Sequence, residues 1–242
     1  MKIVAIIQAR IGSTRLPGKV LEDLAGEPML ARVVNRTRRA KTLDTVIVAT
    51  TTQPDDDAIV SLCKERGWPF FRGSEVDVLD RYYRTASVFK ADVVVRVTSD
   101  CPLIEPLIID EVVQECLSHH PEIDYISNSL ERTFPRGLDV EVISFIALKR
   151  AWQEDTDPAL REHVTPYIQR HPEKFKIRNV ANDADYSHMR WTVDTIEDLT
   201  FIRKIYNRFQ SDEFSWKDVI LLLERNPEWL EINRHVRQRT VS

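Results

Sequence analysis

Two glycines and a lysine lie close together in residues 9–21, which read ARIGSTRLPGKVL. Such a segment after an apolar run is typical of loops that bind phosphate, because free backbone amides and positive side chains both attract anions. It differs from the P-loop pattern G-x-x-x-x-G-K-S/T, since five residues separate Gly12 from Gly18, one of them is Pro17, and a valine follows Lys19. If this loop holds phosphates, it does so in another way than a P-loop.

The same segment carries Arg10, Arg15 and Lys19, although the chain as a whole has a formal net charge of -4. Two of the six glycines of the chain also fall here, which indicates that the backbone turns tightly or approaches a ligand closely. Concentrated cations after the first strand of an α/β sheet predict an anion site at the edge where such sheets bind ligands. A solvated turn with surface arginines is the alternative.

Two aspartates follow strand-like segments further along the chain. Asp100 comes just after the apolar run at 92–98, and Asp194 directly follows the strand-like RWTV. Two carboxylates beside a phosphate loop supply the hard oxygen ligands that Mg²⁺ prefers, with the remaining positions left to substrate phosphates and water. Each aspartate could instead cap a helix, Asp194 together with Glu197, and the spacing does not decide between the two roles.

Cysteine and histidine offer no separate chemistry. The three cysteines are odd in number and show no CxxC spacing, so neither a disulfide framework nor a zinc site is indicated, and we expect a reducing cytoplasm. Cys101 beside Asp100 is better explained as a small buried thiol than as a nucleophile. The histidines show no HxxxH or HExxH pattern, and no GxSxG motif is present.

The elements that must position these residues alternate between strands and helices in the first half of the chain, as in βαβ units around a parallel sheet. Continuous apolar runs, typical of strands covered on both faces, predict strands at 2–8, 45–50 and 92–98. Helices are expected at about 28–41, 54–66 and 76–90. The acidic run at 55–57 is interpreted as a cap at the start of the middle helix, not as a metal site.

After residue 120 the pattern changes. Two extended segments around a turn are expected in 123–144, followed by helices at about 145–153 and 158–170 and a strand at 175–181. We interpret the region at about 125–175 as a mixed insertion used for oligomer contacts. Further helices are expected at about 195–209 and 215–224, and the weakly patterned residues 227–242 are expected to form a loose tail.

Composition predicts one ordinary globular domain. The 242 residues are 43% hydrophobic and 30% charged, enough for one large hydrophobic core. The negative net charge argues against broad nucleic-acid binding, which needs a basic face. The first apolar run is too short for a signal peptide or a membrane span, so no membrane association is expected.

Several motifs together resemble a known family. The segment IIQARIGSTRLPGKVL resembles the opening motif of the CMP-sugar synthetases, the cytidylyltransferases that act on Kdo and on acylneuraminates. The segments FRGSEVDVLDRYY, RVTSDCPLIEP, NSLERTFPRGLDVEV, REHVTPYI and RWTVDTIEDL make the chain similar to the branch named for spore coat polysaccharide biosynthesis. The resemblance covers roughly residues 3 to 206.

The resemblance implies an α/β, Rossmann-like nucleotidyltransferase fold with a mostly parallel sheet in a three-layer arrangement, CTP as donor, Mg²⁺ as cofactor and a homodimer formed through the insertion. By position it implies a set of nucleotide-binding residues, namely Ala9, Arg10, Gly12, Ser13, Arg15, Lys19, Arg81, Thr98 and Ser99. Asp100 and Asp194 match the metal-binding aspartates, and Lys19, Arg10 and Asp100 would carry catalysis. The acceptor would face Asn128, Arg132, Arg136, Glu141 and His163.

The expected activity is the transfer of CMP from CTP to a sugar or sugar acid, with release of pyrophosphate, in surface polysaccharide biosynthesis. The Kdo enzymes have GDEP where this chain has SDCP, and the acceptor segment also differs, so the acceptor stays open. A glycosyltransferase-like protein is one alternative, although the DxD-type segments DDD and DAD lie at a helix start and in a loop. A non-catalytic nucleotide-binding protein of polysaccharide assembly is another, and would be expected to lack Lys19 or one of the two aspartates. A sugar-1-phosphate nucleotidyltransferase would more often show a GxGxRxxP-like loop.

Overall fold

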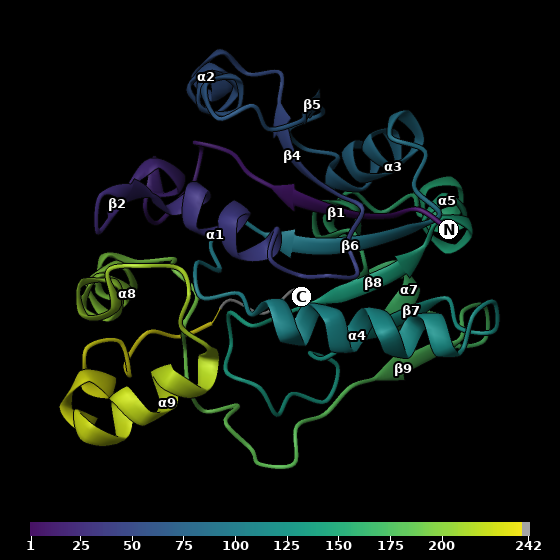
Figure 1. Cartoon of the computed structure of the whole chain (residues 1–242). Coiled ribbons are helices and arrows are strands. Elements are labelled where there is room, and N and C mark those ends of the chain that lie inside the picture. Colours follow the sequence, from purple (N-terminus) through teal and green to yellow (C-terminus); the bar gives the residue numbers. More distant parts are fainter. Residues whose placement is uncertain (239–242) are drawn as a thin grey trace.

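A seven-stranded sheet forms the centre of the protein in a computed structural model that describes residues 1–238 (Figure 1). Its strands lie in the order β5-β4-β1-β6-β8-β7-β9. They are β1 (Ile3–Gln8), β4 (Thr45–Thr51), β5 (Phe70–Gly73), β6 (Val93–Thr98), β7 (Tyr125–Ser127), β8 (Glu141–Ser144) and β9 (Ile177–Asn179). Only the pairs that include β8 are antiparallel. The sheet is therefore mostly parallel, as predicted.

Helices cover both faces of the sheet, which explains why its central strands are continuously apolar. In β1, Ile3, Ala5 and Ile7 belong to one buried cluster, whereas Val4 and Ile6 belong to the other. The first cluster packs against α1 (Met29–Thr37), α2 (Asp57–Glu65), α4 (Pro106–Ser118), α8 (Ile196–Phe209) and α9 (Trp216–Arg225). The second packs against α3 (Val78–Val88), α5 (Phe145–Glu154) and α7 (Pro166–Arg170). The predicted three-layer arrangement follows.

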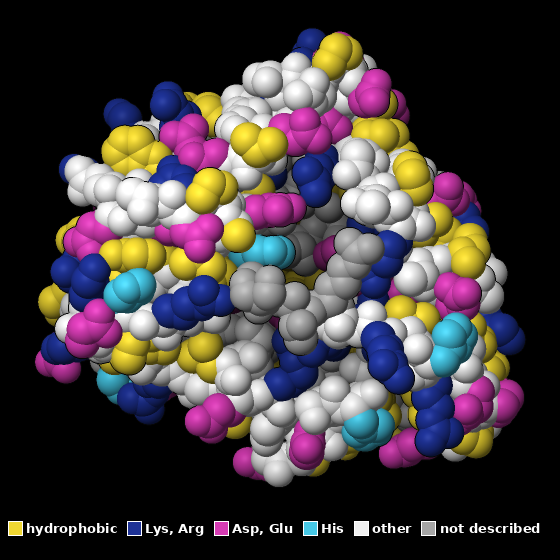
Figure 2. All heavy atoms as spheres, turned by 180° about the vertical axis from the view of Figure 1, so that it is seen from behind, with side chains coloured by type: hydrophobic (Ala, Val, Ile, Leu, Met, Phe, Trp, Pro, Cys, Tyr) yellow, Lys and Arg dark blue, Asp and Glu magenta, His cyan; other side chains and the backbone are white. Residues whose placement is uncertain are grey.

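Short elements complete the chain. They are the 3-10 helices η1 (Lys19–Leu21), η2 (Pro54–Asp56) and η3 (Pro227–Glu231), the small hairpin of β2 (Asp23–Leu24) and β3 (Glu27–Pro28), and the helix α6 (Pro158–His163). No helix in residues 1–238 has the length and apolar character needed to cross a membrane. Figure 2 shows that acidic and basic side chains are interspersed on one face of the molecule, around a hollow near its centre.

Two element predictions were wrong in detail. The helix expected at 28–41 ends at Thr37, and beyond it the backbone amides of Lys41 and Thr42 donate to the Asp110 carboxylate. The helix expected at 158–170 is two helices, α6 and α7, because Val164 between them has a left-handed φ of 72°. The acidic run at 55–57 lies at the start of α2 as expected, with Asp56 at the N-cap position and Asp57 in the first turn, but the Asp56 side chain makes no capping hydrogen bond.

The strand-like segment at 190–194 is not a sheet strand in the described residues. It makes one isolated bridge, between Arg136 and Arg190. Gly137 has a φ of 109°, and a Cβ added there would lie 2.7 Å from the carbonyl carbon of Trp191. The backbone of 190–194 therefore packs against the backbone at Gly137. The Val193 amide also donates to the carbonyl of Asp100 at 2.8 Å. These backbone contacts position Asp194, which does not follow a strand of the sheet.

The predicted insertion at 125–175 contributes β7, β8, α5, α6 and α7, and its strands continue the central sheet. Of the tail expected at 227–242, residues 239–242 lie outside the described residues. The remainder includes η3 and the buried Asn233, whose side chain donates to Asp198 at 2.9 Å and to the carbonyl of Arg190 at 3.0 Å.

Candidate active site

A cavity of about 420 Å³ opens where β1 and β6 end at their carboxyl ends. Its lining includes most of the residues predicted for nucleotide, metal and catalysis: Ala9, Arg10, Ser13, Arg15, Lys19, Arg81, Thr98, Ser99, Asp100 and Asp194. Gly12 is not among the lining residues. The segments that the sequence singled out separately, the opening loop, the end of β6 and the stretch before α8, are thus brought to one place.

The opening loop is shaped by its own backbone and by one buried carboxylate. Gly18 has a left-handed φ of 75°, and its amide donates to the carbonyl of Ile11 at 3.0 Å. The amide of Ile11 in turn donates to the carboxylate of Asp56 at 2.7 Å, and the hydroxyl of Thr51 contacts the same carboxylate. Asp56 is only 2% exposed. The acidic run at 55–57 therefore contains the residue that anchors the opening loop, a role that the sequence did not reveal.

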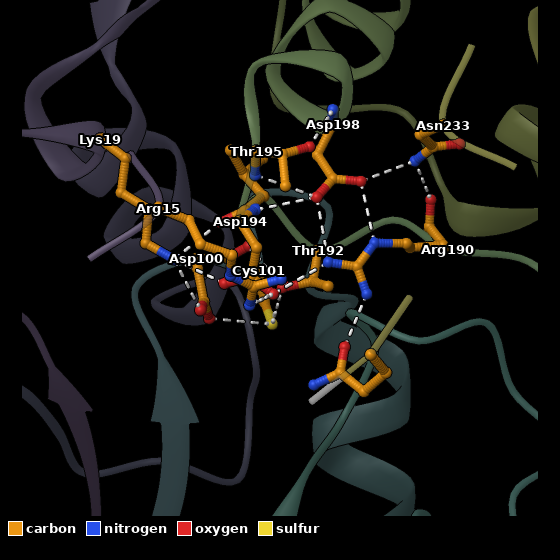
Figure 3. A network of polar contacts seen from close by, with 12 residues as sticks. Arg15, Lys19, Asp100, Cys101, Arg190, Thr192, Asp194, Thr195, Asp198 and Asn233 are labelled. Atoms are coloured by element: carbon orange, nitrogen blue, oxygen red, sulfur yellow. Dashed lines mark hydrogen bonds and ion pairs between the residues drawn. The ribbon is translucent and has the colours of Figure 1, made fainter. Parts of the chain in front are cut away.

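Lys19 lies between the two aspartates (Figure 3). Its Nζ donates to Asp100 Oδ2 at 3.0 Å, to Asp194 Oδ1 at 3.0 Å and to the carbonyl of Val193 at 2.7 Å. Burial lowers the pKa of Lys19, but Asp100 and Asp194 raise it by more, so the net pKa lies above the usual value. For Asp100, burial raises the pKa, but Lys19 and the Thr98 hydroxyl bring it below its usual range. Lys19 and Asp100 are therefore both charged at neutral pH.

Neither aspartate caps a helix. Glu105 is the N-cap of α4, and its carboxylate accepts from the amide of Leu107. At α8 the N-cap is Thr195, which forms a capping box with Asp198, not with Glu197. The capping alternative is thus excluded for Asp100 and Asp194, and both carboxylates face the cavity.

A buried network holds Asp194 in position (Figure 3). Asp198 is fully buried and accepts from the amides of Asp194 at 3.0 Å and of Thr195 at 3.1 Å. Arg190 donates to Asp198 through Nε at 2.9 Å and through Nη2 at 3.0 Å, and also to Asp194 Oδ2 at 2.9 Å. Asn233 donates to Asp198 from the far end of the chain. The sequence does not reveal these supporting contacts, because Asn233 is distant from Asp198 along the chain.

The other predicted cations differ in their surroundings. Arg15 pairs with Asp194 Oδ2 at 2.9 Å, whereas Arg10 is more exposed and lies 3.8 Å from Glu75 and 3.6 Å from Glu162. Arg81 is only 2% exposed and donates to the carbonyl of Ser74. Burial lowers the pKa of Arg81. The cavity therefore holds several cations whose present partners are protein carboxylates and carbonyls.

The residues predicted for the acceptor divide into two groups. Arg136 and His163 line the cavity, whereas Asn128, Arg132 and Glu141 do not. The Asn128 amide donates to the carbonyl of Leu138 at 2.8 Å and accepts from the amide of Val140 at 2.8 Å. Arg132 pairs with Asp139, and Glu141 with Arg96 at 3.0 Å. The partners Arg96 and Asp139 line the cavity, although sequence analysis did not name them.

The donor set suits a hard divalent cation. Asp100 Oδ2, Asp194 Oδ1 and the carbonyl oxygen of Val193 converge on one point, where they now surround the Lys19 ammonium. No group of three or more His, Cys, Asp or Glu side chains that could hold a metal is present in residues 1–238. A metal held here would thus have two protein carboxylates and would take other ligands from substrate and water, as Mg²⁺ commonly does. Burial raises the pKa of Cys101 well above its usual value, which disfavours a thiolate ligand or nucleophile.

Comparison with known proteins gives two relatives that match over nearly the whole chain and one that matches over about half of it. The chain is 40% identical to the uncharacterized protein MJ1063 of Methanocaldococcus jannaschii over 242 residues, covering 99% of this chain and 98% of that protein. It is 34% identical to the spore coat polysaccharide biosynthesis protein SpsF of Bacillus subtilis, covering 93% and 95%. A 3-deoxy-manno-octulosonate cytidylyltransferase of Geobacter sulfurreducens is 41% identical over 131 residues, covering 51% of this chain and 48% of that protein.

The fold and the family agree with these relatives. A solved cytidylyltransferase structure from Leptospira borgpetersenii superposes with a TM-score of 0.92 at 35% identity, covering 99% of this chain and 100% of that chain. This confirms the predicted Rossmann-like fold. The sequence profile of the cytidylyltransferase family matches residues 4–225. The chain therefore belongs to the cytidylyltransferase family and is a nucleotidyltransferase, as the resemblance of its motifs predicted.

Proposed function

We propose that this chain transfers CMP from CTP to a sugar or sugar acid, with release of pyrophosphate, in the biosynthesis of a surface polysaccharide. The observation that carries the proposal is the Lys19 ammonium held between Asp100 and Asp194, beside an arginine-bearing loop in one cavity. The similarity to the spore coat polysaccharide biosynthesis protein SpsF and to the Geobacter cytidylyltransferase supports the pathway and the substrate class.

In the proposed reaction, an acceptor oxygen attacks the α-phosphate of CTP. A new oxygen–phosphorus bond forms, the bond from the α-phosphorus to the bridging oxygen breaks, and pyrophosphate leaves with that oxygen. Such transfers depend mainly on positioning and charge stabilisation. Lys19 and Arg10 would offset charge on the transferred and leaving phosphates, and Arg15 would bind the same triphosphate. Asp100 and Asp194 would hold Mg²⁺, which neutralises phosphate charge and lowers the pKa of a hydroxyl when bound.

The acceptor is proposed to lie beside Arg136 and His163. Arg136 lines the cavity and has no ion-pair partner within residues 1–238, so a negatively charged acceptor group could pair with it. Burial lowers the pKa of His163, so its imidazole is neutral at neutral pH and can take the proton of an acceptor hydroxyl. Asn128, Arg132 and Glu141 would act indirectly. Asn128 would hold the backbone at 138–140, and Arg132 and Glu141 would hold Asp139 and Arg96, which line the cavity. We propose a cytoplasmic homodimer formed through residues 125–175.

The test combines binding and turnover. Thermal shift with CTP, UTP, ATP and GTP, each with Mg²⁺, should show stabilisation by CTP above the other nucleotides. Pyrophosphate release is then measured over a panel of keto-sugar acids and sugar phosphates. Asp100→Asn should abolish release while circular dichroism stays unchanged, and Lys19→Ala should slow it by about 10²-fold or more. Undiminished release by Asp100→Asn would remove this carboxylate from the site.

A further inference from the structure

The ammonium group of Lys19 uses all of its hydrogen-bonding capacity at one point. An ammonium has three donors, and the three acceptors are Asp100 Oδ2 at 3.0 Å, Asp194 Oδ1 at 3.0 Å and the Val193 carbonyl at 2.7 Å. The Lys19 side chain is only 10% exposed. Lys19 is therefore a buried cation whose three donors all have acceptors within the protein.

The same three oxygens are the ones that a divalent cation would use. Carboxylate and carbonyl oxygens are the ligands that Mg²⁺ and Mn²⁺ prefer, and residues 1–238 contain no alternative cluster of metal-ligating side chains. An ammonium and a divalent cation cannot share one set of oxygens, because like charges in contact repel strongly in a site of low dielectric. Only one of the two cations can occupy this position at a time.

Asp194 is built to stay in place when the occupant changes. Its Oδ2 is held by Arg15 and by Arg190, each at 2.9 Å, whereas its Oδ1 accepts from Lys19. Arg190 is itself fixed by the buried Asp198. Removal of the ammonium therefore exposes Oδ1 without releasing the carboxylate from its arginine partners.

We propose that Lys19 and the divalent metal exclude one another from this position, so that the metal enters only together with the triphosphate. The phosphate oxygens supply the acceptors that the Lys19 ammonium needs when it leaves the two aspartates, since a buried cation without partners would be costly. This inference rests on the proposed function and adds to it an order of binding. In the free protein the Lys19 ammonium occupies the metal position, and binding of the nucleotide draws the ammonium away from it.

Removal of the Lys19 ammonium should therefore increase the affinity of the free protein for a divalent metal. Wild-type protein, Lys19→Met and Lys174→Met are titrated with Mn²⁺ without nucleotide, and free Mn²⁺ is followed by electron paramagnetic resonance. Lys174 is the matched control, because it pairs with Glu154 at 2.9 Å and does not line the cavity. Lys19→Met should bind Mn²⁺ at least about tenfold more tightly than wild type, since a state populated at about 10% or less costs that factor in apparent affinity. Lys174→Met should match wild type.

A double variant tests whether the gained Mn²⁺ binds at the two aspartates. Adding Asp100→Asn to Lys19→Met should remove the gained affinity. Circular dichroism checks each fold, and Lys19→Gln replaces Lys19→Met if the latter does not fold. Equal Mn²⁺ binding by free wild-type protein and the folded Lys19 variant would overturn the proposal. Stabilisation of the wild type by CTP is measured separately. If CTP stabilises the wild type but Mn²⁺ binding is equal in the two proteins, only the mutual exclusion of Lys19 and metal is overturned. Absence of stabilisation by CTP would count against the proposed function.

Discussion

Two capping boxes of the same type differ in what surrounds them, and the difference predicts unequal costs of one substitution. Asp198 in α8 and Asp218 in α9 each occupy the same position of a capping box, opposite Thr195 and Ser215. Asp198 is fully buried, whereas Asp218 is exposed. We expect Asp198→Asn to destabilise the protein far more than Asp218→Asn.

The magnitude follows from the contacts of Asp198. Its carboxylate accepts two hydrogen bonds from Arg190 and one each from the Asp194 amide, the Thr195 amide and Asn233. An asparagine cannot accept all of these, and it leaves Asp194 as the one carboxylate paired with Arg190 in residues 1–238. Loss of one partner of a buried ion pair costs about 3–5 kcal/mol, whereas loss of an ordinary cap costs about 1 kcal/mol.

The assay is urea unfolding of both variants and the wild type, together with pyrophosphate release. Asp198→Asn should lower the free energy of unfolding by about 3 kcal/mol or more and should also reduce turnover, because Asp194 loses its support. Asp218→Asn should lose about 1 kcal/mol and keep full activity. Equal losses in the two variants would refute the view that the Arg190–Asp198–Asn233 network carries more than a helix cap.

Three further predictions test other parts of the account. Asp56→Ala leaves the Ile11 amide and the Thr51 hydroxyl without their acceptor, so unfolding should become easier by about 2–3 kcal/mol and CTP should bind less tightly in a titration, whereas Asp57→Ala, at an exposed pair with Arg72, should change little. Gly137→Ala should destabilise much more than Gly67→Ala in thermal unfolding, because both have positive φ but only Gly137 lies against the backbone of Trp191; equal costs would leave backbone conformation as the whole effect. Because the pKa of Asp100 is lowered in the folded protein, the charged carboxylate stabilises the fold at pH values above its usual pKa of about 3.9, and because the pKa of Lys19 is raised, the ammonium stabilises the fold below about pH 10.4. The difference in unfolding free energy between wild type and Asp100→Asn should therefore be constant from about pH 5 to 9 and shrink as the pH falls below about 4. A difference that persists at low pH would contradict this.

Much of the fold could be predicted because its information is local. Continuous apolar runs predicted β1, β4 and β6, and their carboxyl ends carry the opening loop and Asp100. The route of residues 190–194 could not be predicted in this way, because RWTV has the composition of a strand while its position depends on Gly137, a residue distant in sequence whose missing side chain allows the two backbones to approach.

The site shows the same division between local and distant information. Lys19, Asp100 and Asp194 were predicted from their chemistry and from a family resemblance, and they converge in the structure. The contact of Asp56 with the opening loop was missed because an acidic run before a helix is most simply a cap, and nothing local reveals that Ile11 donates to it. Arg96 and Asp139 were missed because their position at the cavity depends on how β6 pairs with β8 and on the loop that precedes β8.

The proposed activity of this site is the transfer of the CMP portion of CTP to an acceptor. The most direct measurement follows CTP labelled in the α-phosphate or in the γ-phosphate, with Mg²⁺ and the acceptor panel, and separates the products. We expect the α-label to move to a sugar nucleotide and the γ-label to pyrophosphate, and we expect Asp100→Asn to form neither product. Transfer of the γ-label to the acceptor, or equal product formation by Asp100→Asn, would contradict the proposal.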